Sequence, residues 1–306
     1  MKVVLAGGSG ALGRRLSEDL EAAGHEVVVL TRRPRSSPFR QVGWDGRTVG
    51  PWADELAGSA VVNLAGELVD RRPTAANVEL LTTSRVEPTR ALVEASTTLS
   101  EPVSVWVQAS TLAIYGDGGD QVLDESAPPA DGPPQMAGVA KAWEAALSGA
   151  NADRMAILRT GIVLDNDTPA LDRLRSLARW GVGGRVGPGT QWISWIHIED
   201  WLAIVRHLLA AGTPDLAGIL HATGPRPVRN AELMAALRRS VRRPAAPPTP
   251  TALVRLGALV LRTDPALALT GRRAVPARLL EAGFEFRHPD LDEALADLRA
   301  RHSRGD

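Results

Sequence analysis

The chain has 306 residues with 35 basic and 35 acidic side chains, so its formal net charge is zero, and it contains no cysteine. The absence of cysteine excludes disulfides, thiol catalysis and cysteine-ligated metals, and the balanced charge argues against nucleic acid as a partner. Apolar runs are too short to cross a bilayer and glycine interrupts the first of them early, so we expect a cytoplasmic protein without a membrane partner.

Short apolar runs alternate with helical patterns up to about residue 165, which is typical of a parallel sheet covered by helices. Strands are predicted at 2–7, 25–31, 60–66, 102–110 and 154–164, and helices at 10–23, 74–98 and 135–150. We therefore predict an α/β fold in which residues 1–165 form a Rossmann-like, doubly wound parallel sheet. Residues 166–306 are predicted to form a smaller, mostly helical C-terminal substrate lobe, with some strands returning to the main sheet.

The second half opens with a glycine-rich loop, 181–189, followed by a strand-like run at 191–201 and a short strand at 218–224. Residues 242–250, RRPAAPPTP, predict a stiff connector that is neither helix nor strand. Asp290 and Glu293 have the spacing of a capping box and predict a helix start.

The first predicted strand leads into a turn with Gly7, Gly10 and Gly13, and then into a helix. Glycines at this junction let backbone N–H groups and the helix dipole approach a pyrophosphate closely. A phosphate loop of the NTPase kind would need Gly-Lys-Ser/Thr, whereas Arg14 and Arg15 follow Gly13. We therefore predict a dinucleotide site whose pyrophosphate contacts are Gly7, Ser9, Gly10, Ala11, Leu12 and Gly13.

The end of the second strand distinguishes the two nicotinamide dinucleotides. An acidic residue there would bind the ribose hydroxyls of NAD, whereas the chain has Thr31, Arg32 and Arg33. A guanidinium pairs with a phosphate through two charge-assisted hydrogen bonds. The sequence therefore predicts NADP(H) as the cofactor, held at the adenosine end by these three residues.

Segments along the whole chain, including LAGGSGALG, NLAGE, STLAIYGD, LRTGIVL and ALTGRRAVPARLLEAGFEF, resemble the extended short-chain dehydrogenase/reductase superfamily. More narrowly, they resemble its epimerase-family subgroup, the NAD-dependent epimerase/dehydratase-like proteins with their own C-terminal region. The resemblance implies an NADP(H)-binding Rossmann-like domain and a lobe that closes over a substrate cleft. It also implies cofactor contacts at Asn63, Leu64, Ala65, Gly66 and Arg85. Two loops depart from the family pattern: Pro73 stands within the expected Arg-Trp-Thr run, and 165–171 lacks paired glycines.

The usual chemistry of the superfamily needs a tyrosine hydroxyl and a lysine four residues later on one helix. Here Lys141 is present, but Ala137 occupies the position of the tyrosine. Lys141 is predicted to hold the nicotinamide ribose, sharing a helix face with Ala137, while a stripe of apolar residues (Met136, Val139, Trp143 and Leu147) faces the core. The remaining candidate catalytic hydroxyls are Ser110, Thr111 and Tyr115, and packing is the preferred interpretation for Tyr115.

Other polar and aromatic residues carry weaker signals. His197 is interpreted as a core histidine, Asp200 as a helix cap, and Glu67 as a carboxylate at the ligand-binding edge of the sheet. No residues have the spacing of a metal site, so no metal is predicted. Four tryptophans lie close together in the sequence, at 180, 192, 195 and 201. Because tryptophan side chains usually pack in the core, we favour core positions for them over a lid above the substrate.

Three functions stay open on the sequence. The first is an NADP(H)-dependent oxidoreductase acting on a small organic molecule without the usual tyrosine. The second is an epimerase or dehydratase with tightly held nucleotide, and the third is a non-catalytic NADP(H)-binding sensor. The oligomeric state stays open between a monomer and a homodimer: the helices at 74–98 and 135–150 pair subunits in many proteins of the superfamily, but the pattern here does not require it.

Overall fold

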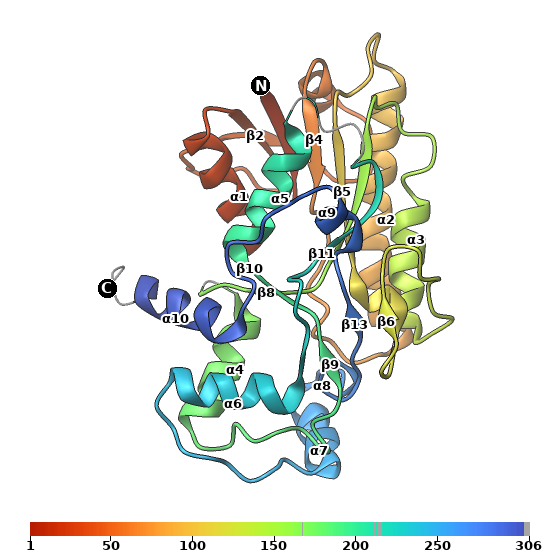
Figure 1. The fold of residues 1–306 in the computed structure, drawn as a ribbon. Helices are drawn as coiled ribbons and strands as arrows, with labels where there is room; N and C mark the ends of the chain where they lie inside the picture. Colours follow the sequence, from red (N-terminus) through yellow and green to blue (C-terminus); the bar gives the residue numbers. More distant parts are fainter. Residues whose placement is uncertain (167, 211, 213–215, 303–306) are drawn as a thin grey trace.

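The computed structural model describes residues 1–166, 168–210, 212 and 216–302. Its centre is a seven-stranded sheet in the order β11-β7-β5-β4-β1-β2-β3 (Figure 1). All neighbouring strands in it are parallel. The strands are β1 (Lys2–Ala6), β2 (Glu26–Thr31), β3 (Arg40–Gly43), β4 (Ala60–Asn63), β5 (Trp106–Thr111), β7 (Met155–Thr160) and β11 (Gly218–Ala222).

The sheet is doubly wound, which confirms the predicted fold class. The chain passes from β1 outward through β2 to β3, and then returns to place β4 on the other side of β1. The carboxyl ends of β1 and β4 are therefore adjacent at the point where the strand order reverses. Open α/β sheets bind ligands at this topological switch point.

Helices cover both faces of the sheet, as buried parallel strands require. α1 (Ala11–Ala22) contacts α5 (Ile198–Leu209), whereas α2 (Ala75–Thr97) contacts α3 (Val139–Ala145). In Figure 1 the two pairs lie on opposite sides of the sheet. The valines and leucines of the inner strands are almost completely buried and form the two main parts of the core.

The run 154–164, predicted as one strand, is two strands in two sheets. β7 belongs to the main sheet, and after Gly161 the chain forms β8 (Ile162–Leu164), which pairs with β10 (Trp195–His197). A Cβ on Gly161 would lie 2.5 Å from the carbonyl oxygen of Ser194. The glycine is therefore needed where the backbone leaves one sheet and passes close to the next.

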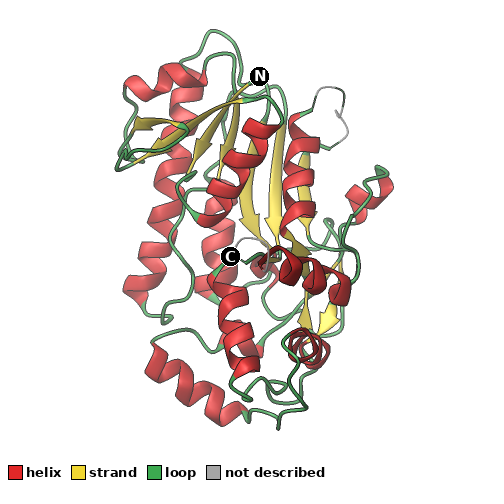
Figure 2. Cartoon of the chain, turned by 90° about the vertical axis from the view of Figure 1, so that its left-hand side faces the viewer, coloured by secondary structure: helices red, strands yellow, loops and turns green. Residues whose placement is uncertain are grey.

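The rest of the chain forms a lobe beneath the carboxyl edge of the sheet, as Figures 1 and 2 show. Its helices are α4 (Pro169–Arg179), α6 (Asn230–Ser240), α7 (Thr251–Leu261), α8 (Ala266–Leu269) and α10 (Leu291–His302), whereas the short helix α9 (Ala277–Glu281) lies against β11 of the main sheet (Figure 1). Two small sheets pair β9 (Trp192–Ile193) with β12 (Val228–Arg229) and β13 (Arg273–Ala274) with β6 (Val122–Leu123). β11 leaves this half of the chain to join the main sheet.

Segments between these helices agree with the sequence signals. Residues 242–250 contain neither helix nor strand apart from one bridge at Thr249. Asp290 Oδ1 accepts the backbone N–H of Asp292 at 3.0 Å and of Glu293 at 3.4 Å, so it starts α10. Within the part of the chain that the structure describes, no helix combines the length and the apolar character needed to cross a membrane.

Candidate cofactor and active site

The glycine turn after β1 packs directly against the loop after β4. Gly7 has φ +78°, a conformation that favours glycine, and a Cβ there would lie 2.8 Å from Leu64 and Ala65 backbone atoms. A Cβ on Gly13 would lie 2.5 Å from Gly8 Cα. The turn therefore holds the start of α1 close to the switch point, with no side chains in between.

The N-terminus of α1 is open at this place. Gly10 is its N-cap residue, and no side chain caps it among the described residues. The first backbone N–H groups of a helix lack intrahelical partners and carry the positive end of the dipole. Ala11 and Leu12 are half-buried and Ser9 is exposed, so the turn is reachable from solvent. These residues fit the pyrophosphate of a dinucleotide.

The end of β2 presents a cation and no acid. Thr31 is buried, and its hydroxyl accepts the N–H of Arg33 at 3.4 Å. The side chain of Arg32 is 72% exposed, and its guanidinium lies 3.6 Å from Glu67 Oε1. Arg71 contacts the other oxygen of Glu67 at 3.3 Å. A phosphate bound by Arg32 would thus compete with a carboxylate that already stands beside it.

The loop after β4 is held from below by buried side chains. Asn63 is fully buried, donates to Thr89 at 2.9 Å and accepts the N–H of Ala65 at 3.1 Å. Arg85 donates to the carbonyl of Glu67 at 2.8 Å, and its guanidinium lies 5.1 Å from the centre of the Trp143 ring.

Burial lowers the pKa of Arg85 to about 10, against the opposite influence of Glu67. Asn63 and Arg85 therefore position the loop, while half-buried Leu64 and exposed Gly66 form its open part. The direct cofactor contacts that the resemblance implies for Asn63 and Arg85 stay predictions.

The helix at 135–150 differs from its prediction. It begins as a π-helix, Pro134–Gly138, and continues as α3 only to Ala145. Ala137 therefore lies in the wider π turn, whereas Lys141 lies in the regular helix α3. Ala137 is completely buried, whereas Lys141 is partly exposed, with its ammonium group 4.0 Å from Asp131.

The predicted apolar stripe is confirmed, because Met136, Val139, Trp143 and Leu147 are all buried. The vacated tyrosine position is closed by packing rather than left as an open pocket.

The three candidate hydroxyls have different surroundings. The Ser110 hydroxyl donates to Glu144 Oε1 at 2.6 Å and is directed toward α3. Thr111 is half-buried, and its oxygen accepts the N–H of Ala113 at 3.1 Å, which caps the short 3-10 helix Leu112–Tyr115. Tyr115 is 4% exposed. Of the three, Thr111 is the one at the carboxyl end of β5 whose hydrogen has no acceptor among the contacts described.

Tyr115 belongs to a buried polar network that the sequence did not reveal. Arg159 forms a two-armed ion pair with Glu144, with both distances at 2.8 Å, and donates to Tyr115 Oη at 2.7 Å. Tyr115 Oη lies 2.6 Å from His221 Nε2, and His221 Nδ1 lies 2.9 Å from the carbonyl of Val275.

Because a carbonyl only accepts, Nδ1 carries the proton and Nε2 accepts from Tyr115. The phenol oxygen also lies 3.3 Å from the carbonyl oxygen of Asp124, so three partners surround it. Burial raises the pKa of Tyr115, although Arg159 opposes this.

The network joins β5, α3, β7 and β11, and through Val275 it reaches the C-terminal region. Its only signals in the sequence are an arginine inside an apolar strand and a glutamate after Trp143, and neither identifies a partner. Packing, the preferred interpretation of Tyr115, agrees with these contacts.

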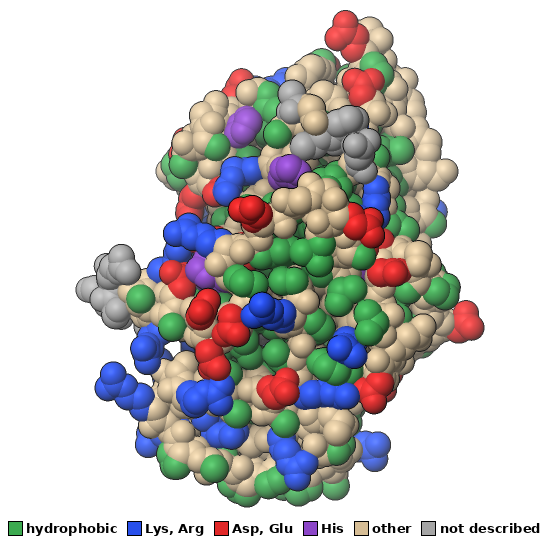
Figure 3. Space-filling view, in the orientation of Figure 1, with side chains coloured by type: hydrophobic (Ala, Val, Ile, Leu, Met, Phe, Trp, Pro, Cys, Tyr) green, Lys and Arg blue, Asp and Glu red, His purple; other side chains and the backbone are tan. Residues whose placement is uncertain are grey.

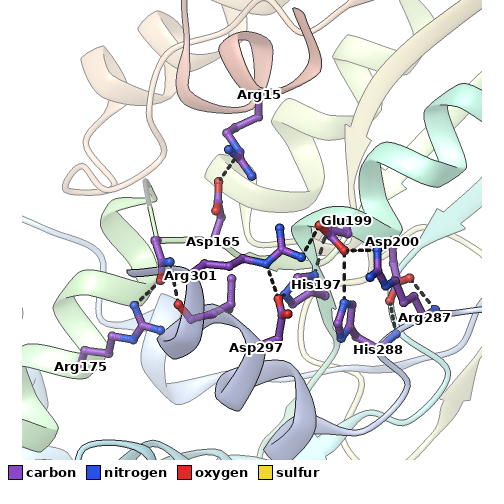
Figure 4. Close-up of polar contacts among 12 residues, drawn as sticks. Arg15, Asp165, Arg175, His197, Glu199, Asp200, Arg287, His288, Asp297 and Arg301 are labelled. Atoms are coloured by element: carbon purple, nitrogen blue, oxygen red, sulfur yellow. Dashed lines mark hydrogen bonds and ion pairs between the residues drawn. The ribbon is translucent and has the colours of Figure 1, made fainter. Parts of the chain in front are cut away.

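A second cluster of charged residues lies between α5 and α10 (Figure 4). Ligand atoms of His197, Glu199 and His288 lie within 4.8 Å of one another, a spacing that could suit a metal ion. However, His197 Nδ1 accepts the N–H of Glu199 at 3.2 Å, so the proton of the neutral ring is on Nε2, where a metal would need a lone pair. Arg287 and Arg301 already pair with Glu199. The arrangement favours an ion-pair network that attaches α10.

His197 and Asp200 exchange the roles expected at the start of α5. We expected Asp200 to cap this helix, but the N-cap is His197, whose ring accepts the N–H of Glu199, the second residue of the helix. Asp200 is 1% exposed and accepts the backbone N–H groups of Arg287 at 2.7 Å and His288 at 3.0 Å. The prediction for Asp200 was wrong, because a distant loop supplies its donors. His197 is a core histidine, as predicted.

The four tryptophans also divide by environment. Trp195 and Trp201 are each 1% exposed and belong to the core. Trp192 packs between Arg229 and Arg273, whose guanidinium carbons lie 4.0 and 4.5 Å from its ring centre. Trp180 at the end of α4 is 84% exposed.

Acid should destabilise the protein through its two most buried histidines. Burial lowers the pKa of His197 and of His221 from 6.5 to about 4. Between these pH values the unfolded chain binds more protons than the folded one. The contribution of the two neutral histidines to the free energy of unfolding is therefore fully present above pH 6.5. It is lost as the pH falls toward 4, by up to ~3 kcal/mol per histidine.

Urea unfolding at pH 7, 5.5 and 4.5 measures this loss. His221→Gln should flatten the pH dependence, and a variant with the unchanged slope of the parent protein would contradict the assignment.

Known proteins resemble the chain along its whole length. Residues 3–143 match the NAD dependent epimerase/dehydratase family, and residues 249–298 match a domain of unknown function, DUF1731. The epimerase family protein SDR39U1 of Bos taurus is 35% identical over 98% of this chain and 100% of its own length. The Mycobacterium tuberculosis epimerase family protein MT2273 is 36% identical over 98% of both chains.

Solved structures extend the likeness to the fold. Human SDR39U1, crystallised with NADPH, superposes with a TM-score of 0.86 at 30% identity, over 98% of this chain and 99% of that chain. A nucleoside-diphosphate sugar epimerase from Corynebacterium glutamicum gives 0.78 at 31% identity, over 98% of this chain and 58% of that one. With such relatives along nearly its entire length, the chain belongs to the epimerase family of SDR39U1-like, extended short-chain dehydrogenase/reductase proteins.

Proposed function

We propose that this protein is an NADP(H)-dependent oxidoreductase of the extended short-chain type, acting on a small organic substrate without the usual catalytic tyrosine. The observation that carries the proposal is the set of groups at the topological switch point. An uncapped helix N-terminus and a glycine turn stand there beside Arg32, and no acidic residue follows β2. The NADPH bound to human SDR39U1 supports the choice of cofactor.

Each part of the cofactor has a matching group in the chain. The glycine turn and the first N–H groups of α1 would hold the pyrophosphate, and Arg32 the adenosine phosphate. Lys141 and Thr111 are assigned to the nicotinamide end. A bound nicotinamide supplies or accepts a hydride, so the protein has to bind, orient and provide a polar partner for the substrate oxygen.

The proton donor is where this chain differs from the superfamily. Ala137 has no proton to give, Tyr115 is enclosed by Arg159 and His221, and the Ser110 hydroxyl is directed toward Glu144. We assign the substrate-oxygen contact to the Thr111 hydroxyl, with water as the proton source. Reductions that need little acid assistance suit such a site best. Because alanine at position 137 cannot donate a proton, a second candidate function is a non-catalytic NADP(H)-binding sensor.

A substrate screen tests the proposal. NADPH fluorescence is followed while carbonyl, enone and imine compounds are added to the protein. Loss of fluorescence that depends on both protein and substrate is the expected result. NADPH that binds but keeps its fluorescence against the whole panel would favour the sensor instead. The cytoplasmic location and the monomeric or dimeric state predicted above remain part of this proposal.

Arg32→Ala should weaken NADPH binding by roughly tenfold to a hundredfold, because a charge-assisted hydrogen bond contributes about 1.5–3 kcal/mol. NADH lacks the phosphate, so its affinity should change little. Isothermal titration calorimetry with both nucleotides measures the difference. Arg35→Ala removes another exposed arginine nearby and serves as the charge-matched control. An NADPH affinity equal in the Arg32→Ala and Arg35→Ala proteins would remove Arg32 from the site.

A further inference from the structure

A cavity of about 530 Å³ lies in the C-terminal lobe, and none of its lining residues belongs to the candidate cofactor site. Helix α4 lines it with Arg175 and Arg179, the turn after α6 with Arg242, and α10 with Arg299. Among the described residues no acidic side chain lines this cavity. Basic side chains gather on the surface over this part of the lobe (Figures 1 and 3). The volume is in the range of sites that bind small molecules.

Arg175 is the buried cation of the cavity. It is 8% exposed, and its Nη1 donates to the side-chain oxygen of Asn166 at 2.5 Å (Figure 4). Asn166 in turn donates to the carbonyl oxygen of Leu298 in α10 at 2.8 Å. These two hydrogen bonds fix the guanidinium between α4 and α10. No second acceptor meets Arg175 within the part of the chain that the structure describes, so its other N–H groups are left for a ligand.

Arg242 is held after α6 in a backbone conformation that glycine adopts more easily. Its φ is +54°, in the left-handed region, and its backbone N–H donates to the carbonyl oxygen of Arg239 at 3.0 Å. A glycine would avoid the steric cost that the Cβ of arginine brings here. The side chains of Arg242 and Arg179 are both exposed, and neither has a carboxylate partner among the described residues. Two cations of the cavity therefore lack a counter-charge within that part of the chain.

The carbonyl ends of two helices supply some of the negative charge that these arginines face. α4 ends at Arg179 and α6 ends at Ser240, and a helix C-terminus carries about half a negative charge. Arg299 donates to the carbonyl oxygen of Ser240 at 3.3 Å. The two helix ends together offset about one of the four positive charges.

Carboxylates near the cavity offset little more. Burial lowers the pKa of Arg175, Asp172 opposes this effect, and the positive charge of Arg179 adds to it. Asp165 also acts on Arg175, but it already pairs with Arg15 at a distance of 3.4 Å between oxygen and nitrogen. With Asp172 as the main carboxylate, roughly two positive charges remain around the cavity. A phosphate monoester carries nearly two negative charges at pH 7.

We propose that this cavity binds the phosphate group of a small metabolite, a phosphate monoester, at a site distinct from that of the cofactor. Each guanidinium presents a planar set of N–H groups that matches two phosphate oxygens. A bound phosphate would link α4, the end of α6 and α10, so it should also stabilise the protein. The site does not depend on the proposed function, because no residue assigned to the cofactor lines it.

Isothermal titration calorimetry of the full chain with glycerol 3-phosphate, near pH 7 and at constant ionic strength, tests the site. The protein is first saturated with NADPH, so that the glycine turn and Arg32 are occupied. Glycerol 3-phosphate should bind with one molecule per chain. It should bind more tightly than sulfate, because its glycerol part fills more of the cavity. Glycerol itself, which lacks the phosphate, should not bind.

Arg242→Gly and Arg179→Gln should each weaken the binding of glycerol 3-phosphate about tenfold, and together by roughly a hundredfold. Arg242→Gly also removes the strain at positive φ, so this variant should be at least as stable in urea as the parent chain. Arg243→Gln is the control, because Arg243 is the next arginine, is exposed and does not line the cavity. It should keep the full affinity, and all three variants should bind NADPH as the parent chain does.

Unchanged affinity for glycerol 3-phosphate in the Arg242→Gly protein, or an equal loss in the Arg243→Gln protein, would overturn the proposal. Sulfate that binds as tightly as glycerol 3-phosphate would also overturn it, because the cavity would then hold an adventitious ion only. Loss of glycerol 3-phosphate binding in the Arg32→Ala protein would place the phosphate in the cofactor site instead.

Discussion

Gly13→Ala is expected to destabilise the protein by about 3 kcal/mol and to weaken NADPH binding more than tenfold. The added Cβ would stand 2.5 Å from Gly8 Cα and 2.7 Å from both the Gly7 oxygen and the Gly8 carbonyl carbon. All of these are backbone atoms, so no side chain can rotate away. Relief requires α1 to move away from the turn that is meant to hold the pyrophosphate.

Gly257→Ala is the matched control for this change. Gly257 lies inside α7, and a Cβ there meets nothing within 4 Å. The same substitution should therefore stabilise the protein, by up to about 1 kcal/mol. Thermal unfolding and calorimetric titration with NADPH measure both variants. A Gly13→Ala protein with the stability and affinity of the parent chain would show that the turn is not packed as described.

Arg159→Met should destabilise the protein by about 3–5 kcal/mol, because it leaves the Glu144 carboxylate without its cation. The Arg159 side chain is 2% exposed and that of Glu144 is 13% exposed, so solvent can replace little of the lost interaction. Tyr115→Phe removes only the hydroxyl between Arg159 and His221, and should cost a smaller amount, about 1–3 kcal/mol. Urea unfolding gives both values.

The double variant Arg159→Met with Glu144→Leu shows whether the loss of stability comes from breaking the ion pair or from disturbing the packing of the core. Removing both charges should recover part of the stability lost in Arg159→Met, since no uncompensated carboxylate remains. If the double variant loses as much stability as the two single variants together, Arg159 and Glu144 are not coupled. If Tyr115 only packs, Tyr115→Phe should also leave turnover with any substrate found in the screen largely unchanged. A large fall in kcat with unchanged substrate binding would instead identify Tyr115 as a proton donor.

Local sequence signals predicted the fold well because strand and helix are encoded within short windows. The valine-rich runs became β1, β2 and β4, and the glycine turn lies at the switch point as expected. Thr74 caps α2 by accepting the N–H of Asn77 at 3.3 Å, which fixes the start of that helix. In contrast, no local pattern distinguishes one long strand from β7 and β8, because the break at Gly161 depends on Ser194 in another segment.

The site was harder to predict because its polar contacts join residues that lie far apart in the sequence. Regular α-helical spacing predicts that Ala137 and Lys141 share one helix face, but the helix starts with a π turn that has no sequence signature of its own. Ser110 and Tyr115 were recognised as hydroxyls, but their partners Glu144, Arg159 and His221 come from three other elements. Likewise, His197 and His288 are far apart in the chain, so their approach became visible only in three dimensions.

We propose that this chain holds NADP(H) through Arg32 at the dinucleotide site beside the glycine turn. Calorimetric titration of the unmodified protein with NADPH and with NADH, side by side at low and moderate salt, tests it most directly. We predict that NADPH binds at least tenfold more tightly, and that added salt narrows the gap because screening weakens the exposed guanidinium–phosphate pair. Equal affinities, or a preference for NADH, would contradict the account.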